Sequence, residues 1–263
     1  MNKNRKKIKR GRGKFWAGSG KFFLFIIIVY LLYLGVLKII EIENDIDRLY
    51  RCEDIEIKGN NITSQNKILA LCGFNQKDDT KIAIDIDKLA KKIMSLNFVK
   101  GVSITPRLPS ILNITIEERQ PIAFIYGRGL NLIDAQGFLM PLPNVEKVWD
   151  FPIITGIRQS LGTLGQQSTA PDTYKALEIV SYLEIENPLL LALVSEINMH
   201  SKNYIELYLI KGGATILINK NSFYRELYIL KNYLARYMDW AELSTIDYID
   251  LRFKDQLIVK HKA

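Results

Sequence analysis

The sequence predicts an α+β protein in which a single N-terminal transmembrane helix is followed by two exported folded units. Three observations predict this arrangement: one long apolar stretch, a charge asymmetry around it, and strand alternations interrupted by a few amphipathic helices. The expected divisions are a basic tail, a transmembrane helix, a juxtamembrane segment, a first α/β unit and a second, mainly β unit, at residues 1–21, 22–40, 41–51, 52–120 and 121–263.

The transmembrane helix is predicted at Phe22–Ile40, which is apolar except for Lys38 near its far end and one glycine. A helix of that length reaches roughly 28 Å, close to the roughly 30 Å hydrocarbon thickness of a bilayer. Nine Lys or Arg residues and no acid precede the stretch, and four acids follow it, so the positive-inside rule places the N-terminus in the cytoplasm. A cleaved signal peptide is the rival interpretation, but its apolar region is normally shorter.

The charge of the chain resides mainly in the tail. The whole chain carries a net charge of +8, and the tail alone carries nine cations, so the remainder is nearly neutral at −1. A basic tail beside a membrane span serves topology and attraction to anionic lipid headgroups. We therefore expect no nucleic-acid partner.

The first exported unit is predicted to have the order strand, helix, helix, strand, strand, with both helices on one face of the sheet. Strand alternation begins at 54–60, and helices are expected at 64–71 and from Asp85 or Asp87 to about Leu96. A proline-containing break at 106–110 joins the last two strands.

The second exported unit is predicted to be a mixed β-domain with two helices. The helices are expected at 172–183 and 222–240, the latter with apolar residues at alternating spacings of four and three. Strands are expected at 122–126, 131–134, 138–141, 151–156, 197–199, 204–210, 214–218, 245–253 and 257–261.

Residues for catalysis are not evident. The two histidines, His200 and His261, stand alone, and neither has a metal-ligand spacing. No nucleophile-elbow or Ser-x-x-Lys motif occurs, and the carboxylate pairs at 78–79 and at Asp85 and Asp87 are interpreted as helix caps and a solvated loop. The sequence thus predicts no enzyme and no catalytic, metal or cofactor-binding residues.

The two cysteines, Cys52 and Cys72, are expected just before the first strand and at the end of the first helix of the α/β unit. A strand and the helix that returns from it run antiparallel, so these two ends should be neighbours. The sequence leaves two interpretations open: a disulfide, or two buried apolar thiols.

Several motifs resemble one known family. Val99–Ser110 and Leu112–Ala123, which include Glu118-Arg119-Gln120-Pro121, resemble the end of the POTRA module in the bacterial cell-division family FtsQ (DivIB). Three further motifs are similar to signatures of that family and stand in the same order: Leu132–Phe138, Phe151–Gly156 and Ile249–Phe253. The resemblance therefore assigns a POTRA domain to residues 52–120 and an FtsQ-type β-domain to residues 121–263.

The resemblance implies a non-enzymatic scaffold of the division septum. Its expected partners are coiled-coil membrane proteins of the FtsB/FtsL kind, together with other divisome and septal peptidoglycan-synthesis proteins. Its expected location is the inner (plasma) membrane at the septum, as a single-pass protein with most of the chain in the periplasm. The alternative is a POTRA-type chaperone or secretion-assembly factor that binds exported polypeptides, and an exported enzyme or substrate-binding domain ranks third.

The terminal hairpin is the predicted partner-binding site. A last strand has no following element to pair with, so its backbone is expected at an open sheet edge where a partner strand can add. The resemblance implies Phe253 as an aromatic anchor and Arg252 as a charge contact, and the terminal strand adds Leu257 and Val259. The alternative is that Phe253 packs in the core and Arg252 pairs with a neighbouring acid.

Overall fold

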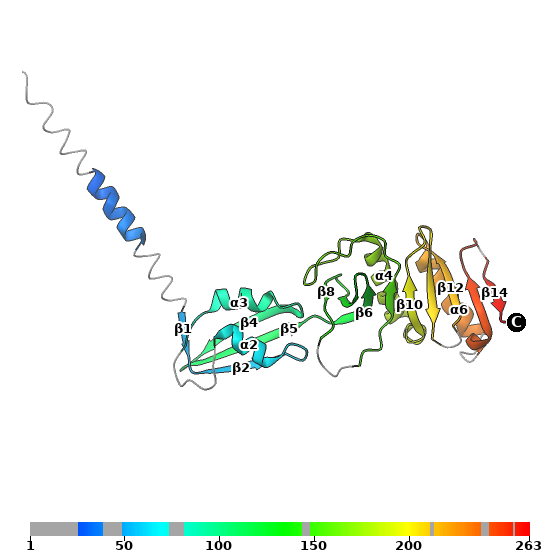
Figure 1. The fold of residues 1–263 in the computed structure, drawn as a ribbon, viewed down its shortest axis with the longest axis horizontal. Helices are drawn as coiled ribbons and strands as arrows, with labels where there is room; N and C mark the ends of the chain where they lie inside the picture. Colours follow the sequence, from blue (N-terminus) through cyan, green and yellow to red (C-terminus); the bar gives the residue numbers. More distant parts are fainter. Residues whose placement is uncertain are drawn as a thin grey trace, which may run out of the picture.

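The computed structural model describes residues 26–38, 49–73, 82–143, 148–210, 213–237, 242–254 and 256–263. Two sheet-based units lie one after the other along the long axis of the molecule (Figure 1). The first contains a three-stranded sheet and the second a nine-stranded sheet. This is the α+β architecture that the sequence predicts.

A helix with exposed side chains occupies residues 26–38, inside the expected transmembrane stretch. Among the described residues, no helix meets the length and hydropathy needed to cross a membrane. The remaining residues of the expected span, 22–25 and 39–40, lie outside the described part of the chain, as do the tail and residues 41–48.

The first unit is built on the strand order β2-β5-β4, with β2 parallel and β4 antiparallel to β5. Its elements are β2 (Asp54–Lys58), α2 (Gln65–Cys72), α3 (Ile86–Met94), β4 (Val99–Arg107) and β5 (Ile111–Glu118). Apolar side chains from both helices and all three strands form one core cluster. The predicted order of strand, helix, helix, strand, strand is present.

Local signals account for the helix ends in this unit. The Asp85 side chain accepts a hydrogen bond from the Lys88 N–H at 3.0 Å, which caps the start of α3 as expected. Gly73 closes α2 in the left-handed conformation, with φ of 71°. Gly59 follows β2 with φ of 82°, and its α-carbon lies so close to the Ile116 carbonyl that a side chain would collide with it.

Two further strands of this unit were not predicted. β1 (Leu49–Cys52) pairs antiparallel with β3 (Ile82–Asp85) in a separate two-stranded sheet. The expected break at Pro106 is also wrong, because Pro106 lies within β4 and faces Leu112 of β5. The loop is shorter than predicted and begins after Arg107.

The second unit has the strand order β14-β13-β12-β11-β10-β9-β6-β7-β8. Its strands are β6 (Pro121–Tyr126), β7 (Leu130–Asp134), β8 (Leu139–Met140), β9 (Ile153–Thr155), β10 (Val194–Asn198), β11 (Tyr204–Leu209), β12 (Thr215–Asn219), β13 (Ile246–Asp250) and β14 (Ile258–His261). β9 is parallel to β6 and β10, and β12 is parallel to β13, while the other neighbours are antiparallel.

Helices pack on the face of this sheet to which the buried, alternate residues of the strands point. The main helices, α4 (Pro171–Glu186) and α6 (Phe223–Tyr237), share one hydrophobic core with the sheet. In β11 every second residue, Ile205, Leu207 and Leu209, is buried. Both helices were predicted, whereas the short α5 (Pro188–Leu191) and the 3₁₀ turn η1 (Glu242–Thr245) were not.

Candidate functional site

The terminal hairpin forms one edge of the nine-stranded sheet. β14 pairs only with β13, with Ile249 facing Val259 and Asp250 facing Ile258, and it ends the strand order. Among the described strands, none lies on the outer side of β14. The open edge predicted from the sequence is therefore present, and its backbone groups are available to another strand.

The side chains of the terminal segment divide between the core and the surface. Leu257 and Val259 are partly buried and pack against the core of the unit, whereas Ile258, between them, is exposed. Leu257 and Val259, two of the residues predicted to bind a partner, thus support the strand from its core-facing side. Ile258 was not among the residues predicted to bind a partner, although strand alternation places it on the opposite, exposed face.

Phe253 is exposed and Arg252 is held by an acid. Phe253 is 51% exposed, so it is not a core residue. Arg252 Nε lies 2.9 Å from Asp250 Oδ1, and Nη2 lies 2.6 Å from Oδ2, a bidentate ion pair. The guanidinium also lies 4.6 Å from the centre of the Tyr204 ring. These contacts hold the charge of Arg252 in one orientation at the sheet surface.

The ion pair changes the ionisation of both partners. Burial by itself would raise the pKa of Asp250, but the hydrogen bonds and charge of Arg252 outweigh it and lower the pKa of that carboxyl. The hydrogen bond to Asp250 in turn raises the pKa of the Arg252 guanidinium. Both groups therefore stay charged near neutral pH.

The backbone that carries Phe253 is fastened to the start of α6. Asn219 Nδ2 donates to the Arg252 carbonyl at 3.0 Å and to Glu226 Oε1 at 2.9 Å. Glu226 is buried and also accepts from Ser222 Oγ at 2.6 Å. A small hollow of about 120 Å³ lies between these residues and Phe253. Phe253 therefore projects from a fixed backbone beside a recess.

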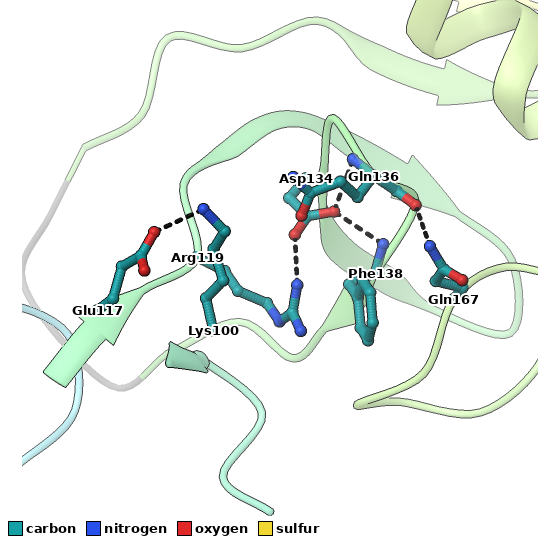
Figure 2. Close-up of polar contacts among 7 residues, drawn as sticks. All are labelled: Lys100, Glu117, Arg119, Asp134, Gln136, Phe138 and Gln167. Carbon is teal, nitrogen blue, oxygen red and sulfur yellow. Dashed lines mark hydrogen bonds and ion pairs between the residues drawn. The ribbon is translucent and has the colours of Figure 1, made fainter. Parts of the chain in front are cut away.

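A second polar centre lies where the two units join. β5 ends at Glu118, Arg119 and Gln120 follow, and β6 begins at Pro121. Figure 2 shows Arg119 pointing toward Asp134, away from the exposed pair of Glu117 and Lys100. We call Glu118 and Arg119 the junction pair.

Glu118 binds the first unit. Its carboxylate accepts hydrogen bonds from three successive backbone N–H groups, those of Asn61 at 2.9 Å, Ile62 at 2.8 Å and Thr63 at 2.6 Å. The side chain belongs to a residue that is only 6% exposed. Successive N–H groups that converge in this way form an anion-binding nest, here filled by the protein itself.

Arg119 binds the second unit. Its Nη1 lies 3.0 Å from Asp134 Oδ2, both side chains are buried, and its guanidinium lies 3.4 Å from the centre of the Phe138 ring. Asp134 Oδ1 accepts from the N–H groups of Gln136 at 3.0 Å and Phe138 at 2.9 Å. The Arg119 N–H donates to the Phe98 carbonyl of the first unit at 2.8 Å. The junction pair thus ties both units to one short connection.

The sequence identified Glu118 and Arg119 only as part of a motif and missed this role. Two adjacent opposite charges at the end of a strand, just before a proline, were the available signal. Their partners lie up to 57 residues away in the sequence, so no local sequence pattern could predict which residues they bind.

Cys72 lies where it was expected, whereas Cys52 ends a strand that was not predicted. Cys72 is buried at the end of α2, and Cys52 is the last residue of β1. The Cys52 side chain lies outside what the structure describes. The disulfide stays a prediction.

Comparison with known proteins assigns a family to both units. A model described as "POTRA domain, FtsQ-type" matches residues 50–119, and one described as "Cell division protein FtsQ/DivIB, C-terminal" matches residues 123–252. The predicted POTRA module and the predicted family are confirmed by these matches.

Individual relatives agree with the models. The cell division protein FtsQ of Geotalea daltonii is 26% identical over 80% of this chain and 76% of its own length. FtsQ of Koribacter versatilis is 24% identical over 81% of this chain, which spans 60% of that longer protein. DivIB of Bacillus subtilis is 31% identical over 37% of this chain and 36% of its own. The chain belongs to the FtsQ/DivIB family of cell-division proteins.

Proposed function

We propose that the chain is a non-enzymatic, membrane-anchored scaffold of the division septum. In this proposal the terminal edge of the β-domain captures coiled-coil proteins of the FtsB/FtsL kind and so helps control septal peptidoglycan synthesis. Family membership supports a role in the divisome. The single observation that carries the choice of surface is the open edge of β14 beside an exposed aromatic side chain.

The edge suits the addition of a partner strand. A segment that pairs with β14 gains backbone hydrogen bonds, and side chains beside the strand fix its register. Exposed Ile258 offers an apolar contact on the strand itself. Arg252, oriented by Asp250 and Tyr204, offers a charge to an acidic side chain of the partner.

Phe253 is the proposed anchor. The residue is 51% exposed, and the hydrogen bond from Asn219 to the neighbouring carbonyl holds its backbone in place. A backbone that is already held in position loses little entropy on binding, which favours affinity. Truncating such an anchor typically costs about 2 kcal/mol, or about thirtyfold in affinity.

The test compares Phe253→Ala with Tyr228→Ala, which removes an exposed aromatic side chain from α6, away from the edge. Capture of the FtsB/FtsL-type proteins of the same organism is measured by titration, alongside the thermal midpoint of each variant. We expect Phe253→Ala to weaken capture about thirtyfold with an unchanged midpoint, and Tyr228→Ala to bind normally. Normal capture by Phe253→Ala, or its unfolding, contradicts the proposal.

The membrane topology belongs to the same proposal. The nine cations before residue 22 and the acids after residue 40 support a cytoplasmic N-terminus and an exported bulk. A reporter fused after Ala263 should be active only outside the cytoplasm. Cytoplasmic activity of that fusion would exclude an extracytoplasmic scaffold.

A further inference from the structure

A cleft of about 880 Å³ lies in the second unit, among the strands at the far end of the sheet order from β14. Its walls are the turn between β6 and β7, at residues 126–131, and the loop that follows β9, at residues 156–164. Arg128 and Arg158, one from each wall, both line it. We call it the arginine cleft.

The walls of the arginine cleft are held by the fold. Gly127 lies so close to Leu161 that an added side chain would meet Leu161 Cδ1 at 2.6 Å, so the turn packs directly on the loop. Thr169 holds the middle of the loop. Its N–H donates to the Leu161 carbonyl at 3.2 Å, and its hydroxyl donates to the Ser160 carbonyl at 3.0 Å. The cleft is therefore present before any ligand binds.

The charge in the cleft is unbalanced. No aspartate or glutamate lines it, although two arginines do. Within the described part of the chain, neither Arg128 nor Arg158 has a hydrogen bond or an ion pair, whereas Arg119 and Arg252 each bind a carboxylate. Arginine is suited to planar, bidentate recognition of oxyanions, so two such groups facing one cleft favour an anionic ligand.

Apolar side chains narrow the choice of anion. Tyr126 and Leu164 are exposed at the cleft, and Ile157 and Leu161 line it partly buried. A phosphate or another small inorganic anion would leave this apolar surface in water. A peptide that carries both carboxylates and apolar side chains would cover it and gain the free energy of its burial.

We propose that the arginine cleft binds an extended acidic and apolar peptide segment of a partner protein, with one carboxylate held by each arginine. This is a second docking surface, separate from the terminal edge. Because the two surfaces lie toward opposite ends of the sheet order, the β-domain can hold two partners at once.

The test uses the full chain in detergent and a fluorescently labelled peptide of ten residues that alternates glutamate and leucine. Binding is followed by fluorescence polarisation for the parent chain, Arg128→Gln, Arg158→Gln and the double variant. Arg236→Gln, an exposed arginine in the last turn of α6, is the matched control. We expect each cleft variant to lower the affinity about tenfold, the control to leave it unchanged, and added salt to weaken binding.

Three outcomes would overturn the inference. One is equal binding by the double variant and the parent chain, including no binding by either. Another is equal binding of a peptide in which glutamine replaces glutamate. The third is polyphosphate displacing the peptide at the same charge concentration, which would indicate a general anion site. Phe253→Ala should leave peptide binding unchanged, so failure here is distinguishable from failure of the terminal edge.

Discussion

Replacing Glu118 with glutamine separates its role from that of its neighbour Glu117. Glu118 is buried and accepts from three backbone N–H groups, whereas the Glu117 side chain is 64% exposed and pairs with Lys100 (Figure 2). The substitutions Glu118→Gln and Glu117→Gln make the same chemical change at adjacent positions. Any difference between them therefore reports the environment of each carboxylate.

The expected losses of folding free energy differ severalfold between the two substitutions. A hydrogen bond to a charged group contributes about 1.5–3 kcal/mol, and two of the three donors, Ile62 and Thr63, are buried. Losing both would cost about 3–6 kcal/mol, and the remaining carbonyl oxygen of glutamine restores part of this, leaving about 2–4 kcal/mol. An exposed pair such as that of Glu117 and Lys100 contributes about 0–1 kcal/mol.

Hydrogen exchange at residues 61–63 and thermal unfolding measure the effect. We expect Glu118→Gln to speed exchange of these amides strongly and to lower the thermal midpoint of the three-stranded unit. Glu117→Gln should change neither measurably. Equal behaviour of the two variants would refute the argument that the buried carboxylate holds this loop.

Three other predictions concern Arg119, the two cysteines and Tyr208. Arg119→Gln leaves a buried carboxylate without its cation and should cost about 3–5 kcal/mol in chemical denaturation, and an unchanged unfolding midpoint would contradict this. Thiol labelling of unfolded, unreduced protein should find no reactive thiol if Cys52 and Cys72 are bridged, while two labelled thiols would exclude the bridge. The hydrogen bond to Glu206 raises the pKa of Tyr208 to about 12 from 10.0, so its stabilisation is complete below pH 10 and is lost as the pH rises through 12. Absorbance titration should show Glu206→Gln bringing this pKa back down, and an unmoved late transition would refute the assignment.

Some features were predictable because their causes are local. Helix α3 was predicted from apolar spacing and an aspartate cap, and the structure has both. The β11 strand was predicted from alternation, which the structure shows as alternating burial. The pairing of the last two strands as a hairpin was predicted from their order, and the structure pairs β13 with β14.

Other features depend on pairing between distant segments. Pro106 lies within a strand because β4 is at the edge of its sheet, where a missing N–H costs little. Strands β1 and β3 stabilise each other across about thirty residues, and neither carries a local pattern strong enough to predict it.

The sequence by itself determined the order of most helices and strands and the family, because periodicity, caps and motifs act over a few residues. Only the tertiary structure decided that Glu118 and Arg119 join the two units and that Arg128 and Arg158 face one cleft. These roles arise from contacts between residues far apart in the chain. The sequence does not distinguish a charged side chain that is exposed to solvent from one that pairs with an opposite charge or lines a cleft.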